Sequence, residues 1–322
     1  MKTFILLSIA FANFAHSQVC PQRVQDATFT VQEPRLDESS GMAFSKRYPN
    51  RLYHINDSGS EPEFFFTDAD GNNSQRVPIR LGFFLDTEDM TVGPCLGESS
   101  CLVIGDIGDN LRFRPSIQFY FFKESNLTKT NLDHLATAGL DLQPDLVLSV
   151  SYPDHSHNSE GFYLDKKGNL TLITKEKNGT TAQIFLLTAD QIHVAALEYV
   201  KKNARVSGDN PKFKSVGKLS LKPLLPSSFA AINTEITGAA YNEVSDTVAI
   251  LTYQGVFEIP MSSLTKQAQT AWIAGTDYVY SPARAGKQQE AISYIPGTSD
   301  LLISSEMGKD GLTPLLKLRC EN

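Results

Sequence analysis

The chain has 322 residues, of which 41 % are hydrophobic, and this is enough for one large domain or two ordinary ones. Its formal charge is −7, from 36 acidic residues against 29 lysines and arginines. A nucleic-acid-binding protein needs a basic surface, so this charge balance argues against nucleic acid as a partner.

Residues 1–17 have the pattern of a secretory signal peptide. Lys2 supplies the positive charge, and an apolar stretch follows up to Phe14. Ala15 and Ser17 are the small residues at the −3 and −1 positions of a cleavage site before Gln18. The stretch is too short for a comfortable membrane span, although a buried N-terminal strand or an anchor helix is the alternative. We therefore expect a mature chain of residues 18–322 that is secreted or periplasmic, monomeric and without a membrane span.

Export makes disulfide bonds possible, and four cysteines allow three pairings. Cys95 and Cys101 flank a short polar loop, whereas Cys20 and Cys320 lie at the two ends of the mature chain. We predict the bonds Cys20–Cys320 and Cys95–Cys101. Free thiols or metal-ligating cysteines are the less favoured alternative, because no nearby His or Cys completes a zinc set.

Beyond Cys20 the chain consists mainly of short β-rich runs separated by Gly, Asn, Asp and Pro, which is typical of an all-β fold. Five runs begin with an acidic or hydroxyl residue and then place apolar residues at their third and fifth positions, so one face of each strand is buried. These runs begin at Ser40, Glu88, Glu160, Thr237 and Glu290. Each is followed by a second and a third strand, and outer fourth strands fit residues 76–81, 146–152, 216–221 and 271–274.

The fifth repeat ends after its third strand, and residues 27–31 near the N-terminus can supply the missing one. Closure of this kind removes free sheet edges. The repeats predict a single β-propeller domain of five four-stranded blades, with the N-terminal strand closing the last blade. Six blades is one alternative, and a β-sandwich or two small β-domains is another. Insertions are expected at 125–143 and 189–214, the latter with a helix over 189–204.

In a propeller, residues that begin the inner strands surround one mouth of the central channel. Carboxylates gathered there repel one another unless some are protonated or a cation neutralises them, and oxygen ligands suit Ca²⁺ or Mg²⁺. We predict metal ligands from these strand starts and from a Gly-flanked loop, namely Glu88, Glu160, Glu290, Asp106 and Asp109. The alternatives are solvated acids without an ion and, for the loop, an ordinary tight turn.

Other polar residues near the predicted mouth complete the candidate site. Ser40, Thr237, Lys175 and Glu306 are the expected ligand-binding residues, and His157 with Glu160 is the expected catalytic pair. A surface-loop histidine is the alternative for His157. No motif for a nucleotide, an organic cofactor, a zinc protease or the usual serine hydrolase is present.

The chain resembles a family of uncharacterised exported bacterial β-propeller proteins over nearly all of its mature length. The segments that carry the resemblance are 38–43, 56–59, 87–94, 105–110, 152–160, 174–176 and 289–291, of which Gly105–Asn110 is the most specific. More loosely, the layout is similar to β-propeller phytases and gluconolactonase-like propellers, and this similarity implies a divalent cation over an acidic channel mouth. The basic cluster that a phytase-like phosphate site needs is missing, because Lys175 alone is close to the predicted mouth.

Three functions remain in competition. The first is an exported propeller whose acidic channel site binds a divalent cation, a small ligand or both, without chemistry. The second is a metal-dependent hydrolase of an ester, lactone or phosphoester, in which the cation polarises the substrate and lowers the pKa of a bound water. The third is a protein-interaction module with a protein partner on the outer face or on the helical insertion.

Overall fold

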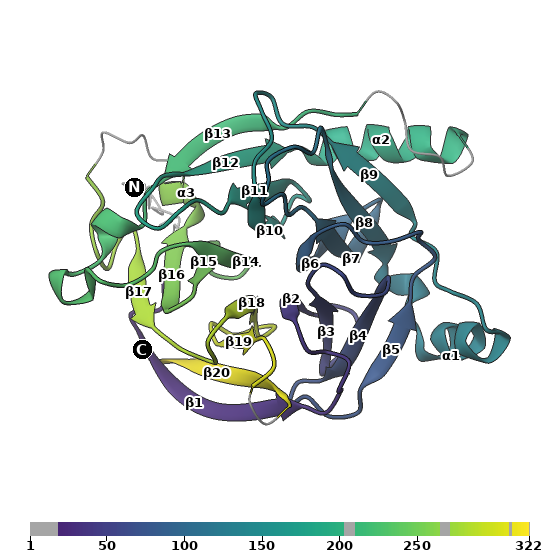
Figure 1. Ribbon diagram of the computed structural model, residues 1–322, viewed down its shortest axis with the longest axis horizontal. Coiled ribbons are helices and arrows are strands. Elements are labelled where there is room, and N and C mark those ends of the chain that lie inside the picture. Colours follow the sequence, from purple (N-terminus) through teal and green to yellow (C-terminus); the bar gives the residue numbers. More distant parts are fainter. Residues whose placement is uncertain (1–18, 203–209, 265–270, 309–310, 322) are drawn as a thin grey trace, which may run out of the picture.

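The computed structural model describes residues 19–202, 210–264, 271–308 and 311–321. Five four-stranded antiparallel sheets stand around a common axis, and the innermost strand of each faces the centre (Figure 1). The five-blade propeller predicted from the repeats is therefore confirmed. The expected signal peptide, residues 1–17, lies outside the described residues.

Each blade is built by consecutive strands from the axis outwards, except at the closure. The first two blades contain β2 (Ser39–Phe44), β3 (Arg51–Asn56), β4 (Glu63–Asp68) and β5 (Gln75–Pro78), and then β6 (Thr87–Cys95), β7 (Glu98–Asp106), β8 (Ile117–Lys123) and β9 (Leu146–Val150). The third and fourth contain β10 (Ser159–Leu164), β11 (Leu170–Thr174), β12 (Ala182–Leu187) and β13 (Lys214–Leu219), and then β14 (Ile236–Asn242), β15 (Thr247–Thr252), β16 (Gly255–Pro260) and β17 (Val279–Pro282). The fifth contains β18 (Gln289–Tyr294), β19 (Leu301–Ser305), β20 (Thr313–Glu321) and β1 (Gln22–Val31).

The N-terminal strand closes the ring as predicted, because β1 pairs with β20 antiparallel from Gln22↔Glu321 to Val31↔Thr313. The Cys20–Cys320 disulfide lies at this seam with its Cα atoms 5.7 Å apart, and Cys95–Cys101 joins the β6–β7 turn. Both predicted pairings are confirmed. Arg23 on β1 also forms a buried ion pair, 2.7 Å long, with Glu258 on β16 of the fourth blade.

The hydrophobic core lies between neighbouring blades. Tyr53 and Phe64 of the first blade, for example, are fully buried in one cluster with Phe122 of the second. Near the axis the inner strands approach so closely that a Cβ on Gly41 would stand 2.6 Å from the backbone nitrogen of Met90. The fully buried Asp89 accepts hydrogen bonds from the backbone N–H groups of Met90, at 2.7 Å, and of Phe162 on β10, at 3.1 Å.

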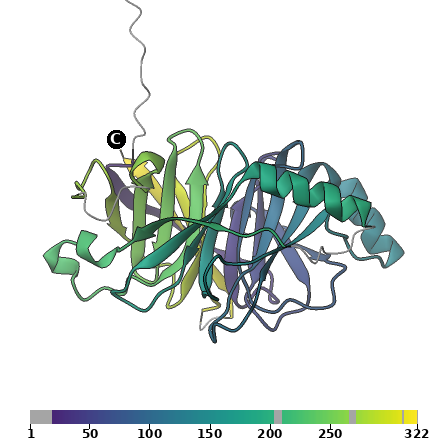
Figure 2. The same ribbon diagram turned by 90° about the horizontal axis from the view of Figure 1, so that it is seen from above.

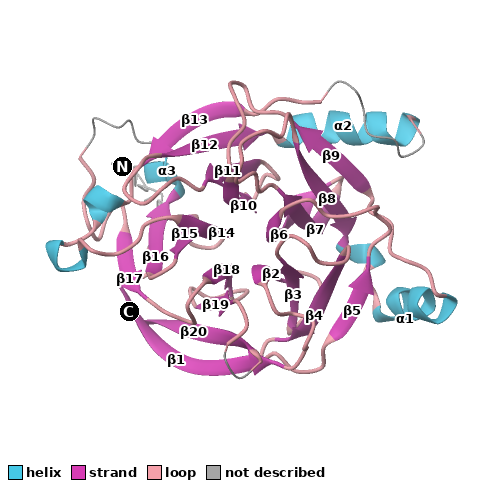
Figure 3. Ribbon diagram, in the orientation of Figure 1, coloured by secondary structure: helices cyan, strands magenta, loops and turns pink. Residues whose placement is uncertain are grey.

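Helices are confined to the rim of the ring, as the side view and the secondary-structure colouring show (Figures 2 and 3). The insertion at 125–143 contains a 3₁₀ turn, η1 (Glu124–Asn126), and a helix, α1 (Lys129–Ala138), which the sequence did not predict. The predicted helix in the second insertion is confirmed as α2 (Ala189–Lys201), while residues 203–209 lie outside the described part. Two more 3₁₀ turns, η2 (Lys222–Leu224) and η3 (Ser227–Phe229), precede β14, and the short helix α3 (Met261–Leu264) follows β16.

The outer strand of the fourth blade was placed wrongly at residues 271–274. The structure has β17 at Val279–Pro282, paired with β16 through Val256↔Ser281 and Phe257↔Tyr280. Residues 271–274 instead lead into a turn, because the Asp277 carboxylate accepts the backbone N–H of Ile273. Ile273 is 58 % exposed, so its apolar side chain does not belong to a packed strand.

Within the described residues, no helix is both long enough and apolar enough to cross a lipid bilayer. All four cysteines form disulfides. The disulfides are compatible with the export that the N-terminal sequence predicts.

Candidate functional site

The second residue of every inner strand occupies a special position in its sheet. In all five blades the register between the first and second strands shifts at this residue. Such a β-bulge leaves the residue unpaired and redirects its side chain. These residues, which we call the first ring, are Ser40, Glu88, Glu160, Thr237 and Glu290, and all five are buried.

The residue directly after each second strand forms a second ring, namely Asp57, Ile107, Lys175, Tyr253 and Glu306. Lys175 connects the two rings, because its Nζ lies 2.5 Å from the Glu160 carboxylate and 2.9 Å from the Tyr253 hydroxyl. Tyr253 in turn donates to Glu290 Oε1 at 3.3 Å. A polar chain therefore runs across the third, fourth and fifth blades.

At the first and second blades, three carboxylates lie close together beside this chain. Asp57, Asp86 and Glu88 each present an oxygen within 4.8 Å of the others, and we call them the acidic triad. Asp86 comes from the loop before β6, Glu88 from the first ring and Asp57 from the second. Gly108 lies against this group, and a Cβ on it would collide with the Asp86 and Glu88 oxygens.

Burial and the neighbouring carboxylates raise the pKa values of Asp86 and Glu88. Burial, reinforced by repulsion from Asp57, raises the pKa of Asp86 to about 6. Burial and then repulsion from Glu160 raise the pKa of Glu88 well above its usual range. The charge on these oxygens must therefore be removed by protons or balanced by a cation.

The first-ring acids beyond the triad are affected in the same way. Burial and repulsion from Glu160 raise the pKa of Glu290 to about 8. Burial raises the pKa of Glu160 to about 7 even though Lys175 counteracts it, while Glu160 raises the pKa of Lys175. Lys175 thus stays charged at neutral pH, and its charge also acts against the raised pKa values of Glu88, Glu290 and Glu306 without cancelling the rise.

The structure gives Asp106 and Asp109 other partners than the triad. Asp106 forms a buried ion pair with Arg114 at 2.7 Å and accepts the backbone N–H groups of Leu85 and Asp86. Asp109 accepts the N–H groups of Phe113 and Arg114 within its own loop. Both carboxylates therefore shape the loops beside the triad, as the tight-turn alternative required, and their role as metal ligands stays a prediction.

The two first-ring hydroxyls bond to neighbouring backbone. Ser40 donates to the Glu88 carbonyl at 2.6 Å, and Thr237 donates to the Gln289 carbonyl at 2.8 Å. Each hydroxyl thus connects its inner strand to the next blade. Glu306 is half-buried and accepts a hydrogen bond from Gln288. A ligand-binding role of Ser40, Thr237 and Glu306 stays a prediction.

The predicted catalytic pair is not joined by a contact within the described residues. Glu160 bonds to Lys175, whereas His157 is buried with its Nε2 3.1 Å from Asp154 Oδ1. The nearest acid to the other ring nitrogen of His157 is Glu176, at 4.0 Å. Catalysis by His157 and Glu160 stays a prediction, and His157 belongs to a different cluster.

Two cavities are large enough to be considered as ligand sites. An open polar cavity of about 630 Å³ has Lys175, Asn158 and Arg112 in its wall and therefore borders the mouth. A second groove of about 370 Å³ lies between α2 and β9 on the outside of the ring, where Val194 is exposed. The first adjoins titratable groups and the second is mostly apolar. The protein-interaction hypothesis for the outer face stays a prediction.

Sequence reasoning missed Tyr253 and left Asp57 and Asp86 out of the assigned ligands. A signal for two of them was present, because Asp57 and Tyr253 occupy the same blade position as Lys175 and Glu306, directly after the second strand. Aligning all five blades at that position finds them. Asp86 has a different signal, because it lies two residues before the first-ring Glu88, as Glu38 and Glu235 lie two residues before Ser40 and Thr237.

No protein-family model and no curated protein match this chain. Among solved structures, it is similar to the PQQ-bound aldose sugar dehydrogenase of Streptomyces coelicolor, with 12 % identity, 93 % of this chain and 98 % of the other covered, and a TM-score of 0.46. The calcium-binding protein regucalcin of Agrobacterium tumefaciens is 10 % identical, with 92 % of this chain and 96 % of the other covered and a TM-score of 0.44. A gluconolactonase of Xanthomonas campestris is 10 % identical, with 87 % of this chain and 72 % of the other covered and a TM-score of 0.40. Likenesses at this level do not assign the chain to any of these proteins' families.

Proposed function

We propose that this propeller binds a divalent cation, Ca²⁺ in the first place, at the acidic triad, and a small ligand in the adjoining cavity. The observation that supports this most directly is the approach of three carboxylate oxygens to within 4.8 Å, with Glu88 buried. Like charges at this distance are costly in a buried site, and Arg114 and Lys175 offset that cost only in part, since the pKa values of Asp86 and Glu88 remain raised. A divalent cation removes that cost and turns the repulsion into binding energy.

The ligand chemistry favours a hard cation. The triad offers only oxygen ligands, and the Ser58 hydroxyl, which contacts Asp86, is a further oxygen donor nearby. Ca²⁺ takes six to eight oxygens at about 2.3–2.6 Å in flexible geometry, whereas Mg²⁺ demands a tighter octahedron and keeps more water. A site assembled from two loops and one strand suits the more tolerant ion.

Calorimetric titration with Ca²⁺ tests the proposal. Asp57→Asn and Asp86→Asn each remove one charged ligand without changing its shape, so each is expected to weaken Ca²⁺ binding by at least about tenfold, which corresponds to about 1.4 kcal/mol. Asp133→Asn is the matched control, because this exposed carboxylate belongs to α1 on the outside of the ring, and the variant should bind like the unmodified protein (Figure 1). Equal affinity in all four proteins would refute the site.

A second pair of variants tests the geometry rather than the charge. Gly108→Ala places a methyl group among the Asp86 and Glu88 oxygens, whereas Gly82→Ala in a neighbouring loop meets nothing within 4 Å. We expect Gly108→Ala to lower the Ca²⁺ affinity by at least about tenfold and Gly82→Ala to leave it unchanged. The measurement is the same titration, and equal affinities of the two variants would contradict a cation between these carboxylates.

A metal-dependent hydrolase is the second candidate, and the carboxyls outside the triad favour it. The pKa values of about 7 for Glu160 and about 8 for Glu290 lie in the range that general acid–base catalysis needs at neutral pH. A cation at the triad would polarise an ester, lactone or phosphoester bound beside it. The test is a screen of these substrates with Ca²⁺, with Glu290→Gln expected to lower the rate at least about 100-fold. Turnover that survives this substitution would exclude Glu290 as the acid–base group.

A further inference from the structure

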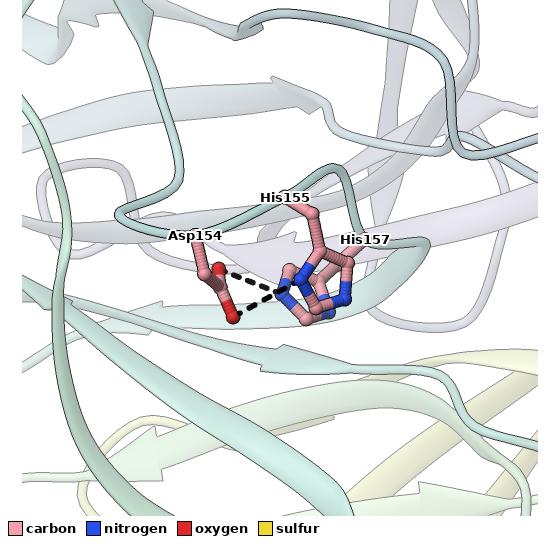
Figure 4. A group of neighbouring side chains, drawn as sticks. All are labelled: Asp154, His155 and His157. Atoms are coloured by element: carbon pink, nitrogen blue, oxygen red, sulfur yellow. Dashed lines mark hydrogen bonds and ion pairs between the residues drawn. The ribbon is translucent and has the colours of Figure 1, made fainter.

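A second cluster of metal-ligating side chains lies in the loop between β9 and β10. Asp154, His155 and His157 occur within four residues, and their ligand atoms all lie within 4.8 Å of one another. Both imidazoles point towards the Asp154 carboxylate (Figure 4). His155 Nδ1 is 3.3 Å from one carboxylate oxygen, and His157 Nε2 is 3.1 Å from the other.

These separations are close to those in a tetrahedral metal site. Metal–ligand bonds of about 2.0–2.1 Å at tetrahedral angles place neighbouring ligand atoms about 3.3 Å apart. The three side chains therefore need little rearrangement to accept an ion between them. His157 is 3 % exposed, while Asp154 and His155 are 49 % and 66 % exposed, so the cluster is open to solvent on the side of Asp154 and His155.

The buried imidazole has an unsatisfied atom that metal binding would correct. His157 Nδ1 is buried and has no hydrogen-bond partner within the described residues, and it faces Glu176 Oε1 at 4.0 Å. When the Nε2–H of a neutral His157 donates to Asp154, its Nδ1 carries no proton. The lone pair of Nδ1 then faces the Glu176 carboxylate, and neither atom can donate a hydrogen bond to the other. An ion on Nε2 leaves the proton on Nδ1, which can donate a hydrogen bond to Glu176 Oε1 once the 4.0 Å separation shortens. Such carboxylate–histidine–metal arrangements orient the ligand and raise its basicity.

The ring of His157 is already held in the orientation that this arrangement needs. Tyr152 packs edge-on against it at a centroid distance of 4.9 Å, and Phe185 lies at 5.1 Å. Glu176 is fixed by its ion pair with Arg112 at 2.7 Å. A rigid imidazole and a positioned carboxylate lower the entropy lost when a metal binds.

We propose that Asp154, His155 and His157 form a site for Zn²⁺ or a similar borderline transition metal, separate from the oxygen-only acidic triad. Imidazole nitrogens suit Zn²⁺, Cu²⁺ and Ni²⁺, whereas Ca²⁺ and Mg²⁺ prefer oxygen. Glu176 is the positioning residue, and the fourth coordination place is open to water or to a ligand. The protein thus holds two metal sites of different chemistry on one side of the ring.

The test is a titration of the full mature protein, free of any polyhistidine tag, with Zn²⁺ and with Co²⁺. We expect one equivalent of Zn²⁺ to bind and Co²⁺ to give the visible absorption bands of a tetrahedral nitrogen- and oxygen-ligated ion. His155→Ala alters an exposed side chain, so it should fold, and we expect it to lower the Zn²⁺ affinity at least about 100-fold, with Glu176→Gln giving about 10-fold. His193→Ala on α2 is the matched control, since it removes an exposed histidine elsewhere.

Two results would overturn the proposal. One is the absence of a Zn²⁺ equivalent in the unmodified protein. The other is the same Zn²⁺ affinity in His155→Ala and His193→Ala, which would place any bound zinc elsewhere. Asp86→Asn distinguishes this site from the acidic triad, because it should weaken Ca²⁺ binding and leave the Co²⁺ spectrum intact.

Discussion

Replacing Cys20 and Cys320 together by serine is expected to lower the free energy of unfolding by on the order of 5 kcal/mol. The two cysteines are 300 residues apart, so their bond closes almost the whole described chain into one loop. In the loop-entropy model such a bond removes more freedom from the unfolded chain than a short one does. The double variant Cys95→Ser with Cys101→Ser is the matched control, because it opens a loop of only six residues and should cost about 2 kcal/mol.

The seam variant should still fold, because other contacts hold β1 in place. β1 pairs with β20 along nearly its whole length, and Arg23 reaches the buried Glu258 of the next blade. Urea unfolding followed by circular dichroism gives the free energies, and limited proteolysis should cut first within residues 19–31. An equal loss in the two double variants would show that closure of the ring, and not the disulfide, determines stability.

The fold was predictable because two independent patterns agree. Alternation of apolar and polar residues fixed the inner strands, and the second residue of each proved to be a bulge in every blade. The cysteine positions pointed to the same closure as the strand count. At residues 271–274 only the local pattern was available, and these four residues were mistaken for a strand. The turn there depends on Asp277, which lies outside the four residues and accepts the backbone N–H of Ile273.

The sequence predicted where the candidate site lies better than it predicted which residues form it. Glu88, Glu160 and Glu290 are brought together at one end of the inner strands, as the repeat required. The partners of each acid depended on tertiary contacts that composition does not reveal. Asp106 and Asp109 have the same residue type as Asp57 and Asp86, yet Arg114 and backbone N–H groups occupy their oxygens.

The remaining large effect concerns pH. In the ion-free protein we expect the free energy of unfolding to fall by about 2 kcal/mol between pH 6.5 and pH 8.5 on account of Glu290. Burial and repulsion raise the pKa of this carboxyl from 4.5 to about 8 in the folded protein. Between pH 4.5 and about pH 8 the folded state therefore binds more protons than the unfolded state. The contribution of Glu290 to the free energy of unfolding is fully present below pH 4.5 and is lost as the pH rises through about 8.

The range from pH 6.5 to pH 8.5 lies above the pH at which His54 would change the free energy of unfolding in the opposite direction. Burial lowers the pKa of His54 from 6.5 to about 3, so the unfolded state takes up the extra proton there, and stability rises with pH until about 6.5. Above that pH His54 is neutral in both states. Glu160, with a pKa of about 7, contributes in the same direction as Glu290.

Glu290→Gln separates the contribution of this one carboxyl. The amide cannot ionise, so the variant should lose less stability between pH 6.5 and pH 8.5 and should exceed the unmodified protein at the upper end. Saturating Ca²⁺ should also reduce the pH dependence, since a cation favours charged carboxylates, and an ion at a hundred times its Kd adds about 2.7 kcal/mol. A free energy that rises with pH across this window in the ion-free protein, measured by urea unfolding at both ends, would mean that the first-ring acids are already ionised. The burial and repulsion that raise the pKa of Glu290 would then be absent.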